Sequence, residues 1–152
     1  MKNNAFFEEF ERIGHEWSEK HVAHEKLKEE IIKTRGWDSP ELKAWYAEEE
    51  EMVSSIPQGA MKAYRAWRYG QGDEVVMEDF CWTAERHDFI DTLRKAGLQS
   101  FVTVNNSTGL MEDIHGYIAE GYTLEGPCTI IKKDNRFGEE TEESIQGLRF
   151  SL

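Results

Sequence analysis

The fold class is decided by residues 84–121, whose sequence is AERHDFIDTLRKAGLQSFVTVNNSTGLMEDIHGYIAEG. Apolar residues recur at helical spacing over 84–96, and Gly97 follows as a C-terminal stop. The run 100–104 is rich in β-branched residues and too short for a helix. It leads through a polar turn into a second helical segment over 110–120. A strand placed between two helices predicts a mixed architecture.

Further strands are expected toward the C-terminus, at 128–131 and 148–150, with a turn over 134–138. The segment 74–82 fits a strand and the lead-in to a helix equally well. Strand–helix–strand spacing of this kind indicates a βαβ unit with a parallel pair of strands. The predicted fold class is therefore α+β, or a small α/β fold, with a small sheet.

The first part of the chain is predicted to be a helical hairpin. Apolar residues at spacings of three and four indicate a long helix over about 4–34, which ends at Gly36. The sequence Asp38-Ser39-Pro40-Glu41 then supplies a cap and a first-turn proline for a second helix. Because the turn between the two helices is short, we expect them to pack antiparallel.

A domain boundary is predicted at the glycine-rich stretch 70–73, which follows a third expected helix over 61–69. The change from helical spacing to shorter, β-rich runs occurs at this point. We therefore expect a helical N-terminal part, residues 1–70, and a mixed C-terminal domain, residues 73–152.

Charge and composition exclude several classes of protein. The chain has 152 residues, with 18 Lys and Arg against 30 Asp and Glu, a formal net charge of −12. Such a balance argues against direct binding to nucleic acid, which needs a surplus of cations on one face. The sequence has no apolar run long enough to span a membrane and no apolar region typical of a signal peptide. We expect a soluble protein of the cytoplasm.

Two acidic clusters and a group of aromatic residues are the candidate contacts for a partner protein. The acids are also consistent with an ordinary solvated surface, and the aromatics with a core between packed helices. Carboxylates spaced along a surface can occupy the cationic groove of a nucleic-acid-binding protein, and aromatic side chains often anchor interfaces. The acidic candidates are Glu48, Glu49, Glu50, Glu51, Glu139, Glu140, Glu142 and Glu143, and the anchor candidates are Tyr64, Trp67 and Tyr69.

A second hypothesis concerns the polar turn between the strand at 100–104 and the helix that follows. Small polar residues at that place bind ligands in many α/β folds, because the helix N-terminus attracts anions. The candidate ligand loop consists of Asn105, Asn106, Ser107, Thr108 and Gly109. Helix capping explains the same residue types, so the turn is also consistent with a purely structural role.

No catalytic, cofactor or metal motif is evident in the sequence. His21, His24 and Glu25 would lie within one helical turn, a spacing at which imidazole and carboxylate can hold a metal. No second metal-binding helix is apparent to complete a cage, so a solvated or partly buried histidine pair is the expectation. We expect no catalytic residue, no metal and no cofactor.

Five stretches in the C-terminal half stand out together: Phe89–Gly97, Ser100–Val102, Asn106–Thr108, Leu110–Glu112 and Glu142–Phe150. They resemble an uncharacterised domain carried by phages and conjugative elements of gut Firmicutes. The resemblance covers roughly residues 80–150 and includes no assigned catalytic residue. Small acidic proteins of such elements include anti-CRISPR and anti-restriction inhibitors.

Charge and resemblance together favour a non-enzymatic inhibitor encoded by a mobile genetic element. Its most concrete form is an anti-CRISPR protein that binds an RNA-guided nuclease, with its acids meeting the cations that normally hold a nucleic-acid backbone. The alternative is a small-molecule or nucleotide-binding module, or a small enzyme, that uses the loop 105–109.

Overall fold

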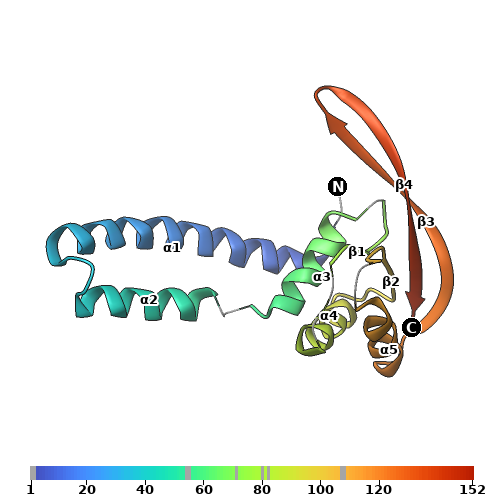
Figure 1. Ribbon diagram of the computed structural model, residues 1–152, viewed down its shortest axis with the longest axis horizontal. Helices are drawn as coiled ribbons and strands as arrows, with labels where there is room; N and C mark the ends of the chain where they lie inside the picture. The colour runs from blue at the N-terminus through green and yellow to red at the C-terminus, as the bar shows by residue number, and fades with distance from the viewer. Residues whose placement is uncertain (1–2, 54–55, 71, 80, 82, 107–108) are drawn as a thin grey trace. The chain divides into compact units, whose positions relative to one another are not determined.

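The computed structural model describes residues 3–53, 56–70, 72–79, 81, 83–106 and 109–152 (Figure 1). These residues form two compact units that divide between Ile56 and Pro57. The first is a helical unit, Asn3–Ile56, and the second is a mixed unit that begins at Pro57. None of the described helices combines the length and the apolar character that crossing a bilayer requires.

The helical unit is an antiparallel pair of helices, α1 (Ala5–Arg35) and α2 (Pro40–Val53). The side chain of Asn4 caps α1 by accepting hydrogen bonds from two backbone N–H groups, and Gly36 ends the helix with a positive φ of 79°. Ser39 Oγ accepts from the N–H of Leu42, 3.2 Å away, and so caps α2. The helical hairpin predicted from the sequence is confirmed, with both helix starts close to their expected positions.

In the part of the mixed unit that the structure describes, three helices pack with a four-stranded sheet. The helices are α3 (Gln58–Arg68), α4 (Thr83–Lys95) and α5 (Leu110–Ala119), and the strands are β1 (Val76–Met77), β2 (Ser100–Thr103), β3 (Thr123–Arg136) and β4 (Glu139–Ser151). The strand order is β1-β2-β4-β3, in which β1 and β2 are parallel and the other neighbours are antiparallel. The α+β fold class is therefore confirmed.

Aromatic rings fill the core of the mixed unit. Phe101 on β2 stacks on Phe150 of β4, with ring centroids 5.2 Å apart and an interplanar angle of 10°. Tyr117 of α5 and Phe89 of α4 meet Phe101 edge-on. Tyr122 adds a third edge-on ring at 5.1 Å. All five rings are buried, so this cluster joins two helices to the two central strands.

Two details of the topology differ from the sequence-based expectation. A parallel pair exists, but it joins β1 and β2 across α4, whereas the strands on either side of α5 are not neighbours in the sheet. The last strand was expected only at 148–150, whereas β4 already begins at Glu139. The side chains of residues 139–147 are mostly exposed, so the alternation of buried and exposed residues that signals a strand is missing there.

The boundary between the units also lies before α3, not at the predicted stretch 70–73. Helix α3 packs closely on α4, since Gly59 lies directly against the backbone carbonyl of Glu85. Lys62 Nζ also lies 2.7 Å from Glu85 Oε2 in a largely buried ion pair. These contacts with α4 make α3 part of the mixed unit, although its sequence continues the helical pattern of the preceding part.

The close approach of α3 and α4 gives a test of the packing. An added Cβ in Gly59→Ala would overlap the carbonyl oxygen of Glu85, so the two helices have to separate. We expect the free energy of unfolding to fall by about 1–3 kcal/mol, as for other overpacked interiors. Urea denaturation followed by circular dichroism measures this change.

Gly14→Ala is the matched control, because Gly14 lies within α1 and an added Cβ there would meet no atom within 4 Å. This variant should be neutral or up to about 1 kcal/mol more stable, since alanine favours the helix. Equal stability of the Gly59→Ala variant and the unmodified protein would contradict the packing described here.

Candidate functional site

The longest two-stranded element of the mixed unit is the outer half of the β3–β4 hairpin. Strand β2 pairs only with Leu148–Ser151 of β4, so the earlier residues of β4 have β3 as their sole strand partner among the described residues. We call residues 131–144 the hairpin arm. In Figure 1 it is the twisted orange and red ribbon that extends beyond β1 and β2. Exposed side chains line β4 from Glu139 to Ser144.

Phe137 forms the tip of the hairpin arm. It is fully exposed, at 103% relative to a free residue, and its φ is +56°. Gly138 follows with a φ of +79°, so both turn residues adopt the left-handed conformation that matches a tight two-residue hairpin. The sequence predicts the turn over 134–138 but does not indicate that Phe137 is exposed at its tip. A large apolar side chain at the end of an exposed ribbon is accessible to a binding partner.

The glutamates of the hairpin arm do not form one row. Because side chains alternate along a strand, Glu139 and Glu143 lie on one face of the ribbon and Glu140 and Glu142 lie on the other. Glu142 also has a cation opposite, with Lys133 Nζ 3.9 Å from its carboxylate. The arm therefore presents two faces of mixed charge with an excess of acids.

The four consecutive glutamates of α2 also divide. Glu49 is only 18% exposed and points toward α1, and Glu48 lies beside His24 at 3.3 Å. Glu50 and Glu51 are exposed. Helical geometry causes this division, since four successive residues cover most of the circumference of a helix. The two predicted acidic clusters thus belong to different units, and each is split within its own unit.

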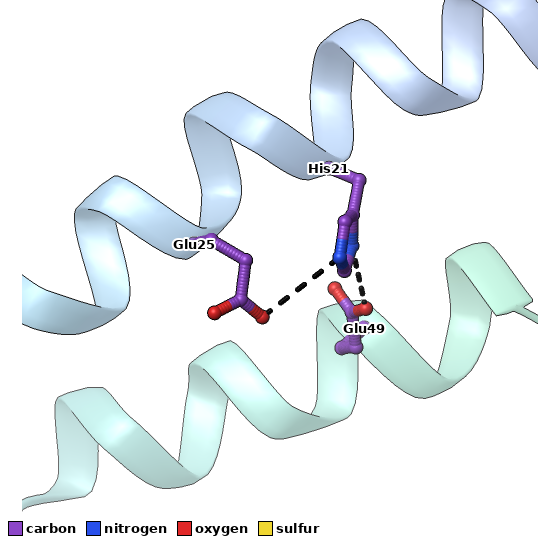
Figure 2. Close-up of side chains that lie close together, drawn as sticks. All are labelled: His21, Glu25 and Glu49. Atoms are coloured by element: carbon purple, nitrogen blue, oxygen red, sulfur yellow. Dashed lines mark ion pairs between the residues drawn. The ribbon is translucent and has the colours of Figure 1, made fainter.

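Glu49 joins two histidines of α1 into a polar cluster at the seam of the helical unit. Its Oε1 lies 3.0 Å from His21 Nδ1, and its Oε2 lies 2.8 Å from His24 Nδ1. Glu25, one helical turn after His21, lies 4.0 Å from the second ring nitrogen of that histidine. Figure 2 shows the imidazole of His21 between the carboxylates of Glu25 and Glu49. We call His21, His24, Glu25 and Glu49 the seam cluster.

Two tryptophans hold the histidine rings of the seam cluster. Trp17 stacks on His21 at 4.8 Å, and Trp45 stacks on His24 at 4.3 Å. The indole N–H of Trp45 donates to the backbone carbonyl of His24 at 2.6 Å. His24 is 8% exposed, so this is a largely buried polar contact between helices. The sequence predicted a partly buried histidine pair but not the carboxylate that joins the two rings.

The predicted anchors and the predicted ligand loop are placed as follows. Trp67 is buried, Tyr64 is half-buried, and Tyr69 is 75% exposed, so Tyr69 is the most accessible of the three anchors. In the loop, Asn105 is buried and Asn106 is exposed, whereas Ser107 and Thr108 lie outside the described residues. The residue that caps α5 is Gly109, in the left-handed conformation.

A buried ion pair joins α4 to α5. Arg86 on α4 and Asp113 on α5 are each more than 90% buried, and Arg86 Nη2 lies 2.8 Å from Asp113 Oδ1. Burial raises the pKa of Asp113, and the hydrogen bonds from Arg86 act against that rise. Burial also raises the pKa of the neighbouring Cys81 thiol to about 11, so this thiol is protonated and a poor nucleophile at neutral pH.

Residues 59–152 match the model of a family described as a domain of unknown function, DUF7698. The chain belongs to this family. No curated protein matches the chain, and no solved structure does. The DUF7698 domain contains the hairpin arm and the Arg86–Asp113 pair, whereas the seam cluster precedes it in the chain. The matched range begins at Gly59, in the first turn of α3, two residues after the start of the mixed unit.

The seam cluster predicts a pH-dependent contribution to stability. The hydrogen bond from His24 lowers the pKa of Glu49, against the opposing effect of burial, and the charge of His21 lowers it further. A carboxylate with a lowered pKa stabilises the folded state at pH values above the ordinary pKa of the group. This stabilisation is lost as the pH falls through the lowered pKa. Glu49→Gln should therefore have a lower melting temperature than the unmodified protein at pH 7.

The difference in melting temperature between Glu49→Gln and the unmodified protein should shrink as the pH is lowered below about 4.5. It should vanish once Glu49 is protonated. Thermal melts at a series of pH values between neutral and strongly acidic measure it. Glu50→Gln on the same helix serves as the control, since Glu50 is exposed, and should show little difference at any pH. A constant difference between Glu49→Gln and the unmodified protein at every pH would show that Glu49 acts through packing alone.

Proposed function

We propose that the protein is an acidic inhibitor of a nucleic-acid-targeting defence protein and that the hairpin arm contacts the target. The observation that carries the proposal is the exposure of Phe137 at the tip of a ribbon whose β4 side chains from Glu139 to Ser144 are solvated. A two-stranded ribbon with so little burial is only marginally stable in water. Burial of Phe137 in a partner would stabilise both the ribbon and the complex.

The charge of the arm suits a basic partner. Its two strands are about 5 Å apart, so the ribbon is narrow enough to enter a groove built for a nucleic-acid strand. The ion pair between Lys133 and Glu142 is exposed on both sides, and such pairs contribute little to stability. Glu142 can therefore exchange Lys133 for a cation of the partner at low cost. The net charge of −12 adds long-range attraction to a cationic groove.

In its most concrete form, the target is an RNA-guided nuclease and the protein is an anti-CRISPR product of a mobile genetic element. The resemblance to a domain of phages and conjugative elements favours this setting, which places the protein in the cytoplasm of a bacterial host. The protein itself is not expected to bind nucleic acid directly, because its own net charge repels phosphates.

The test is cleavage of target DNA by a panel of purified RNA-guided nucleases, each with and without the protein. For a nuclease that is inhibited, Phe137→Ser should raise the inhibitor concentration needed for half inhibition at least tenfold, about 1.4 kcal/mol, as expected for an anchor residue. Trp37→Ala is the matched control, because Trp37 is a 69% exposed aromatic of the helical unit. This control should inhibit as well as the unmodified protein.

Salt separates steering by charge from anchoring by Phe137. Binding to the inhibited nuclease should weaken as salt is raised, and Glu139→Lys with Glu140→Lys should reduce this salt dependence and slow association. Failure to inhibit or bind any nuclease of the panel at low salt would refute the inhibitor proposal. If Phe137→Ser inhibits the nuclease as strongly as the unmodified protein does, the protein is an inhibitor but the hairpin arm is not its contact with the nuclease.

A further inference from the structure

The seam cluster of the helical unit takes no part in the proposed function, and its residue types are those of a metal site. It brings an imidazole and two carboxylates together from two different helices, α1 and α2 (Figure 2). We propose that His21, Glu25 and Glu49 bind a divalent transition-metal ion such as Zn²⁺, which links α1 to α2. Zinc takes nitrogen from histidine and oxygen from Asp or Glu in this way.

The distances between the three ligand atoms suit a bound ion once the side chains move slightly closer together. One ring nitrogen of His21 and one carboxylate oxygen from each glutamate all lie within 4.8 Å of one another. Tetrahedral Zn²⁺ with bonds of about 2.1 Å requires ligand atoms roughly 3.4 Å apart. His21 and Glu25 are 34% and 45% exposed, so their side chains have room to rotate and close this gap. Their exposure also lets water complete the coordination.

The spacing of the ligands in the sequence places all three at the contact between α1 and α2. His21 and Glu25 are four residues apart on α1, so their side chains share one face of that helix. Glu49 comes from the facing helix and lies 3.0 Å from His21 in the absence of any ion. A site with ligands on both helices is complete only when the helical hairpin is folded, so ion binding stabilises the hairpin.

Residues around the ligands hold them in place before an ion binds. His24 Nδ1 lies 2.8 Å from the second oxygen of Glu49 and thereby orients this carboxylate. Trp17 stacks on His21 with an interplanar angle of 11°, which restricts the ring of the nitrogen ligand. Hydrogen bonds and packing around the ligands of a metal typically change its affinity by about 10–100-fold. His24 is thus a positioning residue of the proposed site.

The charge of the site also favours a cation. Glu25 and Glu49 lie on either side of His21, and Glu48 lies 3.3 Å from His24. Several carboxylates that converge within a few ångströms repel one another, and a divalent ion relieves this repulsion. In the sequence alone, His21, His24 and Glu25 lacked a ligand from a second helix. Glu49 supplies that ligand, because α2 folds back along α1.

The test uses the full chain, freed of metal with a chelator and titrated with Zn²⁺ by calorimetry. One ion should bind per chain and raise the melting temperature, and the chelator should reverse the rise. Co²⁺ in place of Zn²⁺ should give the visible absorption typical of tetrahedral coordination. Glu25→Gln and Glu49→Gln should each weaken Zn²⁺ binding at least tenfold. Glu25 contacts His21 at 4.0 Å and takes no part in the His24–Glu49 contact, so its substitution leaves that contact in place.

His15→Ala and Glu50→Gln are the matched controls, since both residues are exposed, lie on the same two helices and stand outside the seam cluster. They should bind Zn²⁺ as the unmodified chain does. Failure of the unmodified chain to bind Zn²⁺ or Co²⁺ would overturn the proposal. So would equal binding by Glu25→Gln, Glu49→Gln and the two controls, because the ion would then be held elsewhere on the surface. Circular dichroism of each variant separates loss of binding from loss of fold.

Discussion

The stacking of Phe101 on Phe150 is the contact on which the rest of the mixed unit depends. These two residues are opposite partners in the antiparallel pair β2–β4, and both are completely buried. A slip of one residue would turn Phe150 to the other face of the sheet and bring Arg149 into the aromatic core. The register is therefore fixed at the C-terminal end of β4. Because β2 has 4 residues and β4 has 13, most of β4 has to run past β2, and the hairpin arm results.

Under the proposed function, this arrangement determines how the arm presents its acidic residues to a partner. The pleat of β4 distributes the glutamates over both faces of the arm, and the register brings Lys132 and Lys133 opposite Glu143 and Glu142. What distinguishes the arm is thus its shape and its apolar tip, Phe137, more than a continuous acidic surface. Charge attracts a basic partner from a distance, whereas a desolvated aromatic anchor supplies most of the binding free energy.

Polar contacts join the two helices of the helical unit, whereas an apolar core joins the elements of the mixed unit. Where two packed helices usually bury aliphatic residues, α1 and α2 meet around His24, Glu49 and Trp45. Polar groups at such a seam stabilise it when they are paired, and Glu49 pairs with His24 through a 2.8 Å hydrogen bond and lies 3.0 Å from His21 Nδ1. The same mutual orientation makes the seam cluster suitable for an ion, since metal ligands also need to be held in place.

The sequence by itself determined the α+β class, the helical hairpin and the approximate positions of most helices, because helical spacing, capping residues and glycine stops are local signals. It also determined the net charge of −12. Tertiary structure alone decided the full length of β4 and the assignment of α3 to the mixed unit. It also brought Glu49 to His21, which lies 28 positions earlier in the chain. These features depend on pairing between distant segments, and no local pattern of residues records which segments will pair.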